Sequence, residues 1–229
     1  MAKGRTNTAP PVDRDFIQSH TTEVALRDGT RVRLRPVLPE DKAKLVEGFR
    51  RLSPESRYRR FHGGVSRLTP ALLQYLTEVD YDNHFAWAAL AVDEPSEPGI
   101  GIARYVRLAE DPEVAEAAVT VADDYQGRGL GTVLLEMIAL TALEHGIRRF
   151  RSYVLSENAP MIGILTRAEA RLEPDSPGVL RVDLNLPDEV ELLRSTTLYE
   201  VLRAVARGEP PPRTRAWPLR RLIPGGDSR

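Results

Sequence analysis

A glycine-rich stretch, Gln126-Gly127-Arg128-Gly129-Leu130-Gly131, lies between a run of apolar residues and a long amphipathic segment. A strand that ends in such a turn and restarts as a helix leaves several backbone N–H groups unpaired and pointing one way. With the positive end of the helix dipole, these donors form an anion site. The stretch therefore predicts a phosphate-binding loop. The alternative is a glycine turn that has no ligand.

The spacing of the glycines excludes two common phosphate motifs. Thr132 occupies the position of the third glycine of a dinucleotide fingerprint, and no Gly-Lys-Ser/Thr follows the turn as in a P-loop. The nature of the phosphate must therefore be decided by the elements around the turn.

The composition excludes several other chemistries. The chain has 229 residues and no cysteine, so disulfides, thiol nucleophiles and thiolate metal ligands are absent. The four histidines show no ligand spacing, so no metal site is expected. The net charge of −1 argues against a nucleic-acid partner. No run of about 18 apolar residues predicts a membrane span, and the N-terminus lacks a secretory signal. We therefore expect a cytoplasmic protein.

The periodicity of apolar residues predicts the elements that must position the glycine loop. Residues 24–35 alternate around Asp28-Gly29, which is typical of a hairpin with a type I′ turn. Helix starts follow at Pro39, Pro54 and Pro70. Strands are then expected at 85–92, 99–106 and 115–121, a helix from Leu130 to a Gly146 cap, a strand at 150–155, a short helix at 158–169 and a hairpin at 171–186.

Three strands in series joined by short turns indicate an antiparallel meander, and the strand–helix–strand order that follows indicates one parallel crossover. We expect an α/β (α+β) fold with a mixed, mostly antiparallel sheet flanked by helices. Residues 23–187 form its one domain. Residues 1–22 are expected as a disordered arm, 188–208 as a C-terminal helix, and 209–229 as a Pro/Arg-rich tail that is either solvated or docks on an acidic partner.

In this strand–turn–helix context, Q-G-R-G-L-G resembles the Q/R-x-x-G-x-G/A signature of the GCN5-related N-acetyltransferases (GNAT superfamily). The resemblance covers about residues 24–186. Within the superfamily the chain is similar to the acetyltransferase domain of bacterial protein-lysine acetyltransferases, in LSPESRYRRF (52–61), VDYD (79–82) and GIARY (101–105). Such enzymes often carry a regulatory nucleotide-binding domain or a ligase-like domain, for which this chain has no room.

The resemblance implies acetyl-CoA as the acyl donor and no metal. The backbone N–H groups of Gln126 through Thr132 would hold the pyrophosphate, and an amide of the preceding strand, that of Val121, would donate to the thioester oxygen. Arg128 would add charge or would be a solvated loop residue. Asn158 would contact the cofactor or only cap a helix. The implied cofactor-binding residues are Val119, Thr120, Val121, Gln126, Gly127, Arg128, Gly129, Leu130, Gly131, Thr132 and Asn158.

An acceptor amine with a pKa of about 10.4 must lose a proton before it can attack. Glu116, ten residues before Gln126, lies where the family often places its base. The alternative is that Glu116 is only a solvated surface residue, with Glu113 and Asp123 in reserve. Leu165 occupies the position of the tyrosine that protonates the leaving thiolate in many members, so no general acid is assigned.

The resemblance thus implies an acetyl-CoA-dependent N-acetyltransferase acting on a protein lysine. A small amine or amino acid is the alternative acceptor. A second hypothesis is a non-catalytic module that binds acyl-CoA, and a third is a nucleic-acid modifier that uses its arginine-rich tail. Acidic residues at 78–82, with Asp111 and Glu113, would attract a cationic acceptor or would be plain surface charge.

Overall fold

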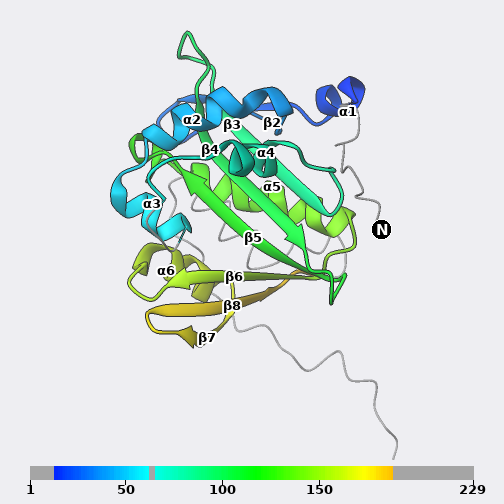
Figure 1. Ribbon diagram of the computed structural model, residues 1–229, viewed down its shortest axis with the longest axis vertical. Helices are drawn as coiled ribbons and strands as arrows, with labels where there is room; N and C mark the ends of the chain where they lie inside the picture. Colours follow the sequence, from blue (N-terminus) through cyan, green and yellow to red (C-terminus); the bar gives the residue numbers. More distant parts are fainter. Residues whose placement is uncertain (1–12, 62–64, 188–229) are drawn as a thin grey trace, which may run out of the picture.

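A computed structural model describes residues 13–61 and 65–187 of the chain. Its centre is one eight-stranded sheet with the order β1-β2-β3-β4-β5-β6-β8-β7 (Figure 1). Only β5 and β6 are parallel neighbours. The strands are β1 Thr22–Ala25, β2 Arg31–Pro36, β3 His84–Ala91, β4 Gly99–Arg107, β5 Val114–Val121, β6 Arg149–Leu155, β7 Arg171–Ser176 and β8 Val179–Asn185. The predicted mixed, mostly antiparallel sheet is confirmed.

Helices cover both faces of the sheet (Figure 1). They are α1 Arg14–Ser19, α2 Lys42–Arg50, α3 Pro54–Phe61, α4 Pro70–Thr77, α5 Leu130–Glu144 and α6 Ala159–Arg167, with short 3₁₀ turns at Pro39–Asp41 and Asp123–Tyr125. The predicted helix starts at Pro54 and Pro70 are confirmed. Thr69 caps α4 through its hydroxyl, which accepts from the Leu72 N–H at 3.2 Å.

The two faces of the sheet are packed differently. On one face α5 buries large side chains, including Phe85, Trp87 and Ile138, and the Trp87 indole N–H donates to the Thr141 hydroxyl at 2.9 Å. On the face below α2 and α4, β3 presents the small side chains Ala86 and Ala88. Small residues on this face leave room between the helices and the sheet.

The hairpin of β1 and β2 forms as predicted, but its turn is not type I′. Only Gly29 has a positive φ, of 84°, whereas Asp28 does not. The Leu26 N–H donates to the Thr30 carbonyl at 2.9 Å, and the Gly29 N–H donates to the Leu26 carbonyl at 3.0 Å. The loop is thus one residue longer than expected, and a longer loop closes with a single left-handed residue.

The expectation of a disordered arm over 1–22 is wrong for the residues after Asp13. The Asp13 carboxylate caps α1 by accepting from the Asp15 N–H at 3.0 Å. The Phe16 ring then packs 5.5 Å from the Tyr81 ring and 6.4 Å from the Phe85 ring, measured between centroids. A hydrophobic anchor of this kind orders the segment. The expected helix at 188–208 and the tail at 209–229 lie outside the described residues, as do residues 1–12.

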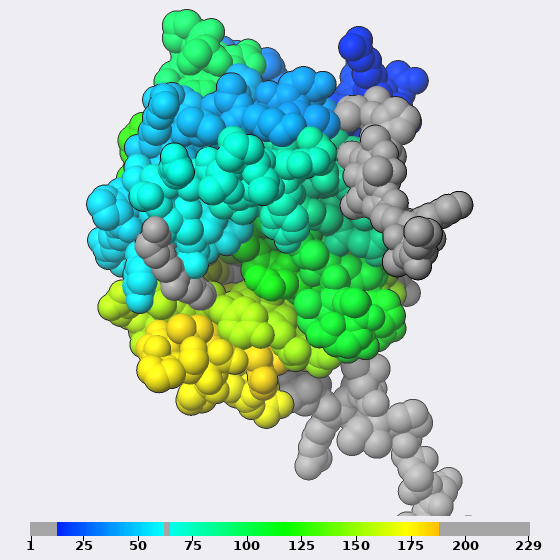
Figure 2. All heavy atoms as spheres, viewed as in Figure 1, coloured from blue at the N-terminus to red at the C-terminus, as the bar shows by residue number. Residues whose placement is uncertain are grey.

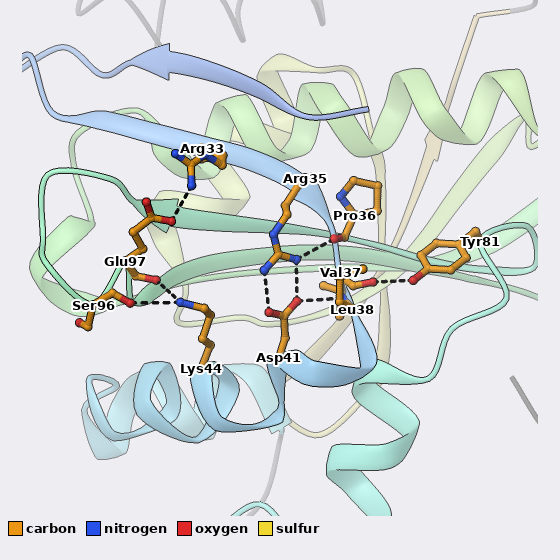
Figure 3. Close-up of polar contacts among 10 residues, drawn as sticks. All are labelled: Arg33, Arg35, Pro36, Val37, Leu38, Asp41, Lys44, Tyr81, Ser96 and Glu97. Atoms are coloured by element: carbon orange, nitrogen blue, oxygen red, sulfur yellow. Dashed lines mark hydrogen bonds and ion pairs between the residues drawn. The ribbon is translucent and has the colours of Figure 1, made fainter. Parts of the chain in front are cut away.

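A buried ion pair joins β2 to the start of α2 (Figure 3). The Arg35 guanidinium donates two hydrogen bonds to the Asp41 carboxylate, at 2.6 and 2.7 Å, and Asp41 also accepts from the Leu38 N–H at 2.8 Å. Farther along α2, the Lys44 ammonium donates to the carbonyls of Ser96 and Glu97. These contacts hold α2 over the sheet.

Candidate functional site

Strands β5 and β6 separate after a short paired stretch. They pair in parallel only at Val114–Glu116 and Arg149–Arg151, and then diverge as a V (Figure 1). At the point of divergence the Ser152 hydroxyl donates to the Ala117 carbonyl at 2.8 Å. Beyond that point, one edge of β5 has no strand partner among the described residues.

A cleft of about 510 Å³ occupies the opening of the V. It is lined by β5, β6, α3, α6 and the start of α5, and Figure 2 shows the surface hollowed where α3 meets β6 and α6. Seven of the predicted site residues line it: Glu116, Val119, Thr120, Val121, Gln126, Gly131 and Asn158. Gly127, Arg128, Gly129, Leu130 and Thr132 are not among the residues that line the cleft.

The open edge of β5 presents the backbone groups of Val119 and Val121. The Ala122 N–H donates toward β4, to the Ile100 carbonyl at 2.8 Å. Because backbone groups alternate along a strand, the N–H and C=O of Val119 and Val121 must point the other way, into the cleft. The Val121 carbonyl accordingly accepts from the Gln126 side chain at 3.1 Å. An extended ligand could pair with this edge as a strand would.

Two residues of the glycine loop have left-handed backbone conformations. Gly127 and Gly129 have φ of 73° and 91°, values that favour glycine. The N–H of Gln126 donates to the Asp123 carbonyl, and the N–H of Thr132 donates to the Gly129 carbonyl. Within the described chain, the N–H groups of residues 127–131 have no recorded acceptor. The predicted donor set is therefore narrower than 126–132.

Two side chains of the loop point into the fold rather than at a ligand. Leu130 is fully buried in the core beside α5, and Thr132 is 3% exposed. Arg128 pairs with Asp28 at 2.8 Å and lies over the Tyr125 ring, with its guanidinium carbon 4.8 Å from the ring centroid. The Arg128 side chain thus ties the loop to the hairpin of β1 and β2.

Gly131 provides a test of close approach at the cleft. A methyl group there would lie 3.6 Å from the Val121 side chain, an ordinary contact, so the fold should tolerate Gly131→Ala. The signature admits alanine at this position, so Gly131→Ala should keep normal thermal stability and bind acetyl-CoA normally. Gly131→Leu should weaken the binding at least tenfold, measured by calorimetry, because its longer side chain extends into the cleft that Gly131 lines. Gly146→Ala is the matched control. Its φ of 76° predicts a loss of about 1–2 kcal/mol of stability with unchanged binding. If Gly131→Leu bound acetyl-CoA as tightly as Gly146→Ala, a ligand at the loop would be contradicted.

Glu116 stands at the apex of the V, in the last residue pair that β5 shares with β6. Its side chain is exposed and lies on the same face as Ala118 and Thr120. Burial lowers the pKa of Arg60, on α3, and the charge of Glu116 opposes that shift. Arg60 lines the cleft as well, so the Glu116 carboxylate faces a cationic side chain there.

A second arginine lies under Arg60. Arg104 of β4 is 4% exposed and donates to the Leu76 carbonyl at 3.0 Å and to the His84 ring at 2.9 Å. Burial, together with the charge of Arg60, lowers the pKa of Arg104 to about 9. Burial and the charge of Arg104 also lower the pKa of His84 to about 4. The region around Arg60 and Arg104, next to the apex of the V, is thus positively charged.

The depressed pKa of His84 makes stability depend on pH. The neutral ring accepts from Arg104, whereas an unfolded histidine binds a proton near pH 6.5. Between about pH 6.5 and 4 the unfolded state therefore binds more protons, and the free energy of unfolding should fall as the pH falls. Urea unfolding at several pH values measures this slope. His84→Gln should flatten it, and an unchanged slope would contradict the assignment.

Several of the acidic residues expected to attract an amine are engaged elsewhere. Glu78 pairs with Lys42 at 2.8 Å, and the Asp80 carboxylate accepts from the N–H groups of Asp82 and His84. Asp111 lies 3.3 Å from Arg149. Asp123 accepts from the Ser53 N–H and the Gln126 side chain, which positions α3 beside the loop. These contacts favour the alternative that the sequence left open, which is that these acidic residues are surface charge and do not attract an acceptor.

Two positions of interest lie at α6, where one side chain caps the helix and the other packs in the core. The Asn158 side-chain oxygen caps α6 by accepting from the Met161 N–H at 3.4 Å, which leaves its amide nitrogen for a ligand. Leu165 is 7% exposed and packs with Val154 and Val182. No hydroxyl therefore occupies the position of the family tyrosine.

The structure adds cleft residues that the sequence did not indicate. Tyr153 of β6 lines the cleft and is 39% exposed. Because Glu116 pairs with Arg151, Tyr153 lies on the same face as Glu116. Arg60 and Ser152 line the cleft too. Strand alternation alone predicts which side chains of β6 share a face with Tyr153. It does not predict that this face meets the cleft, because that depends on the register of β6 with β5.

Comparison with known proteins agrees with this geometry. Residues 31–171 match the model of the acetyltransferase (GNAT) domain. The chain belongs to this family. It is 37% identical over 193 residues to an acetyltransferase named Pat of Mycolicibacterium smegmatis, covering 80% of this chain and 57% of that protein. The chain thus spans little more than half of that relative.

Two further relatives support the assignment. An acetyltransferase of Pseudomonas aeruginosa is 37% identical over 137 residues, which cover 60% of this chain and 73% of that protein. The crystal structure of the GNAT domain of S. lividans PAT superposes with a TM-score of 0.67 at 32% identity, covering 77% of this chain and all of that one. The GNAT expectation is confirmed.

Two features are absent from the described residues. No three of their histidine, aspartate or glutamate side chains gather as a metal site. None of their helices is both long and apolar enough to cross a membrane.

Proposed function

We propose that this GNAT domain transfers an acetyl group from acetyl-CoA to the side-chain amine of a protein lysine. The observation that carries the proposal is the V between β5 and β6, with free strand-edge amides along one arm and Glu116 at its apex. The relatives named as acetyltransferases support the acetyl transfer.

The pyrophosphate of the donor would lie at the N–H groups of residues 127–131, and the pantetheine arm would pair with the edge of β5. We assign the oxyanion donor to the Val119 amide rather than to that of Val121. At about 3.4 Å per residue, Val119 lies about 10 Å along the strand from Glu116, and Val121 about 17 Å. Only the Val119 amide would hold the thioester close enough to Glu116 for proton transfer through a water molecule.

Each residue then has one task in the transfer. Glu116 accepts the proton of the ammonium, directly or through water, so that the amine can attack the thioester carbon. The Val119 N–H stabilises the oxyanion of the tetrahedral intermediate. The C–S bond breaks as the amide forms, and the second proton that the nitrogen loses balances the proton that the departing coenzyme A thiolate takes up. Among the described residues that line the cleft, the tyrosine is Tyr153. We assign Tyr153 to protonate the leaving thiolate, because Leu165 occupies the position of the family tyrosine.

A protein acceptor suits the shape and charge of the cleft. At about 510 Å³ it is a broad groove, and Glu116 is the acidic side chain among the described residues that line it. A small pocket with several acidic groups would instead suit a free amine. Acyl-CoA binding without transfer is the second candidate, because Leu165 removes the usual acid.

Radiolabelled acetyl-CoA incubated with the full chain, a panel of proteins and a panel of free amines tests the proposal. We expect label on protein lysines, with release of the free thiol. Label on free amines alone would establish the small-molecule alternative. Label on neither, with calorimetric binding of acetyl-CoA, would establish the binding module.

A cytoplasmic location stays a prediction.

A further inference from the structure

A second cavity lies on the far side of β5 from the open edge. It has a volume of about 80 Å³ and sits between the sheet and helices α2 to α4. Its lining is mostly apolar, and includes Val37, Phe49, Leu52, Leu76, Ala88 and Ile102. The small side chain of Ala88 on β3 helps to create it. The volume is several times the roughly 10–15 Å³ that one water-sized group needs.

The second cavity meets the cleft at one point on β5. Arg60, Phe61 and Thr120 line both spaces. Thr120 lies between Val119 and Val121, and therefore beside the proposed position of the thioester. Its hydroxyl is buried and has no hydrogen-bond partner in the described structure. A carbonyl group held at this junction would supply the missing acceptor.

Charge excludes an amine from the second cavity. Arg60 and Arg104 line it, and a buried ammonium beside two guanidinium groups would be repelled and desolvated together. Its one carboxylate among the described residues, Asp41, is already paired with Arg35. A neutral hydrocarbon group meets no such penalty and gains from burial.

We propose that the second cavity holds the hydrocarbon tail of the acyl group, so that this domain binds propionyl-CoA and butyryl-CoA more tightly than acetyl-CoA. The proposal rests on the acyl-CoA function proposed above. A tail that leaves the thioester beside Thr120 passes directly into the apolar space, whereas the acceptor amine approaches from the cleft at Glu116.

Calorimetry of the full chain with acetyl-, propionyl-, butyryl- and succinyl-CoA tests this without any acceptor. Each added methylene should tighten binding about fourfold, the fold-change that corresponds to about 0.8 kcal/mol. Butyryl-CoA should thus bind more than tenfold more tightly than acetyl-CoA. Affinity that stays flat or falls with chain length overturns the proposal, as does a preference for succinyl-CoA. Failure of all four to bind would instead overturn the acyl-CoA function itself.

Filling the cavity is the second arm of the test. Ala88→Val should abolish the gain from propionyl to butyryl while leaving acetyl-CoA binding within twofold. The matched control is Ala86→Val, on the same strand and the same face but outside the cavity lining, which should keep the full gain. If Ala88→Val does not fold, Leu45→Phe fills the cavity from α2. An unchanged chain-length series in a folded filling variant contradicts the proposal.

Discussion

Glu116→Gln is expected to lower kcat for acetyl transfer at least tenfold while acetyl-CoA binds as tightly as before. The carboxamide has the shape of the carboxylate but cannot take the proton of the attacking ammonium. General base catalysis typically contributes about 10²–10⁴-fold to a rate. The side chain lies at the apex of the V, away from the glycine loop, so the donor phosphates should not sense the change.

Steady-state kinetics with a protein acceptor measure the effect, and calorimetry measures acetyl-CoA binding. Glu113→Gln is the matched control, because Glu113 is an exposed carboxylate three residues away that is absent from the described lining of the cleft. An unchanged kcat for Glu116→Gln, or a larger loss for Glu113→Gln, would remove Glu116 as the base.

Asp41→Ala should destabilise the fold by about 3–5 kcal/mol. The side chains of Arg35 and Asp41 are only 12% and 7% exposed, so removal of the carboxylate leaves a buried guanidinium without its counter-charge. The Leu38 N–H also loses its acceptor. The midpoint of urea unfolding measures the loss, which is large compared with the stability of a typical domain.

The exposed pair of Arg31 and Asp93 is the control for Asp41. Its side chains are 61% and 45% exposed, so Asp93→Ala should cost about 1 kcal/mol or less. The double replacement Arg35→Met with Asp41→Leu should recover most of the loss, because it removes both charges together. Equal losses for Asp41→Ala and Asp93→Ala would show that the buried pair is as well solvated as the exposed one.

The local features of the fold could be predicted because they depend on a few adjacent residues. Prolines and a capping threonine mark helix starts, and alternating apolar residues mark the strands. Errors arose where the outcome depended on distant parts of the chain. The segment after Asp13 is ordered because Phe16 packs against Tyr81 and Phe85, which are far away in the sequence. The hairpin turn differs because its loop is one residue longer than the alternating pattern indicates.

The sequence by itself determined the glycine loop, its place between a strand and a helix, and Glu116 on that strand. These features are local, because backbone N–H groups left unpaired at a helix start need no distant partner. Only the tertiary structure decided what surrounds them. Arg128 pairs with Asp28, one hundred positions away, and the short parallel register of β5 with β6 opens the cleft and places Tyr153 on the same face as Glu116. Such contacts depend on how separate strands pair and pack, which no local pattern specifies.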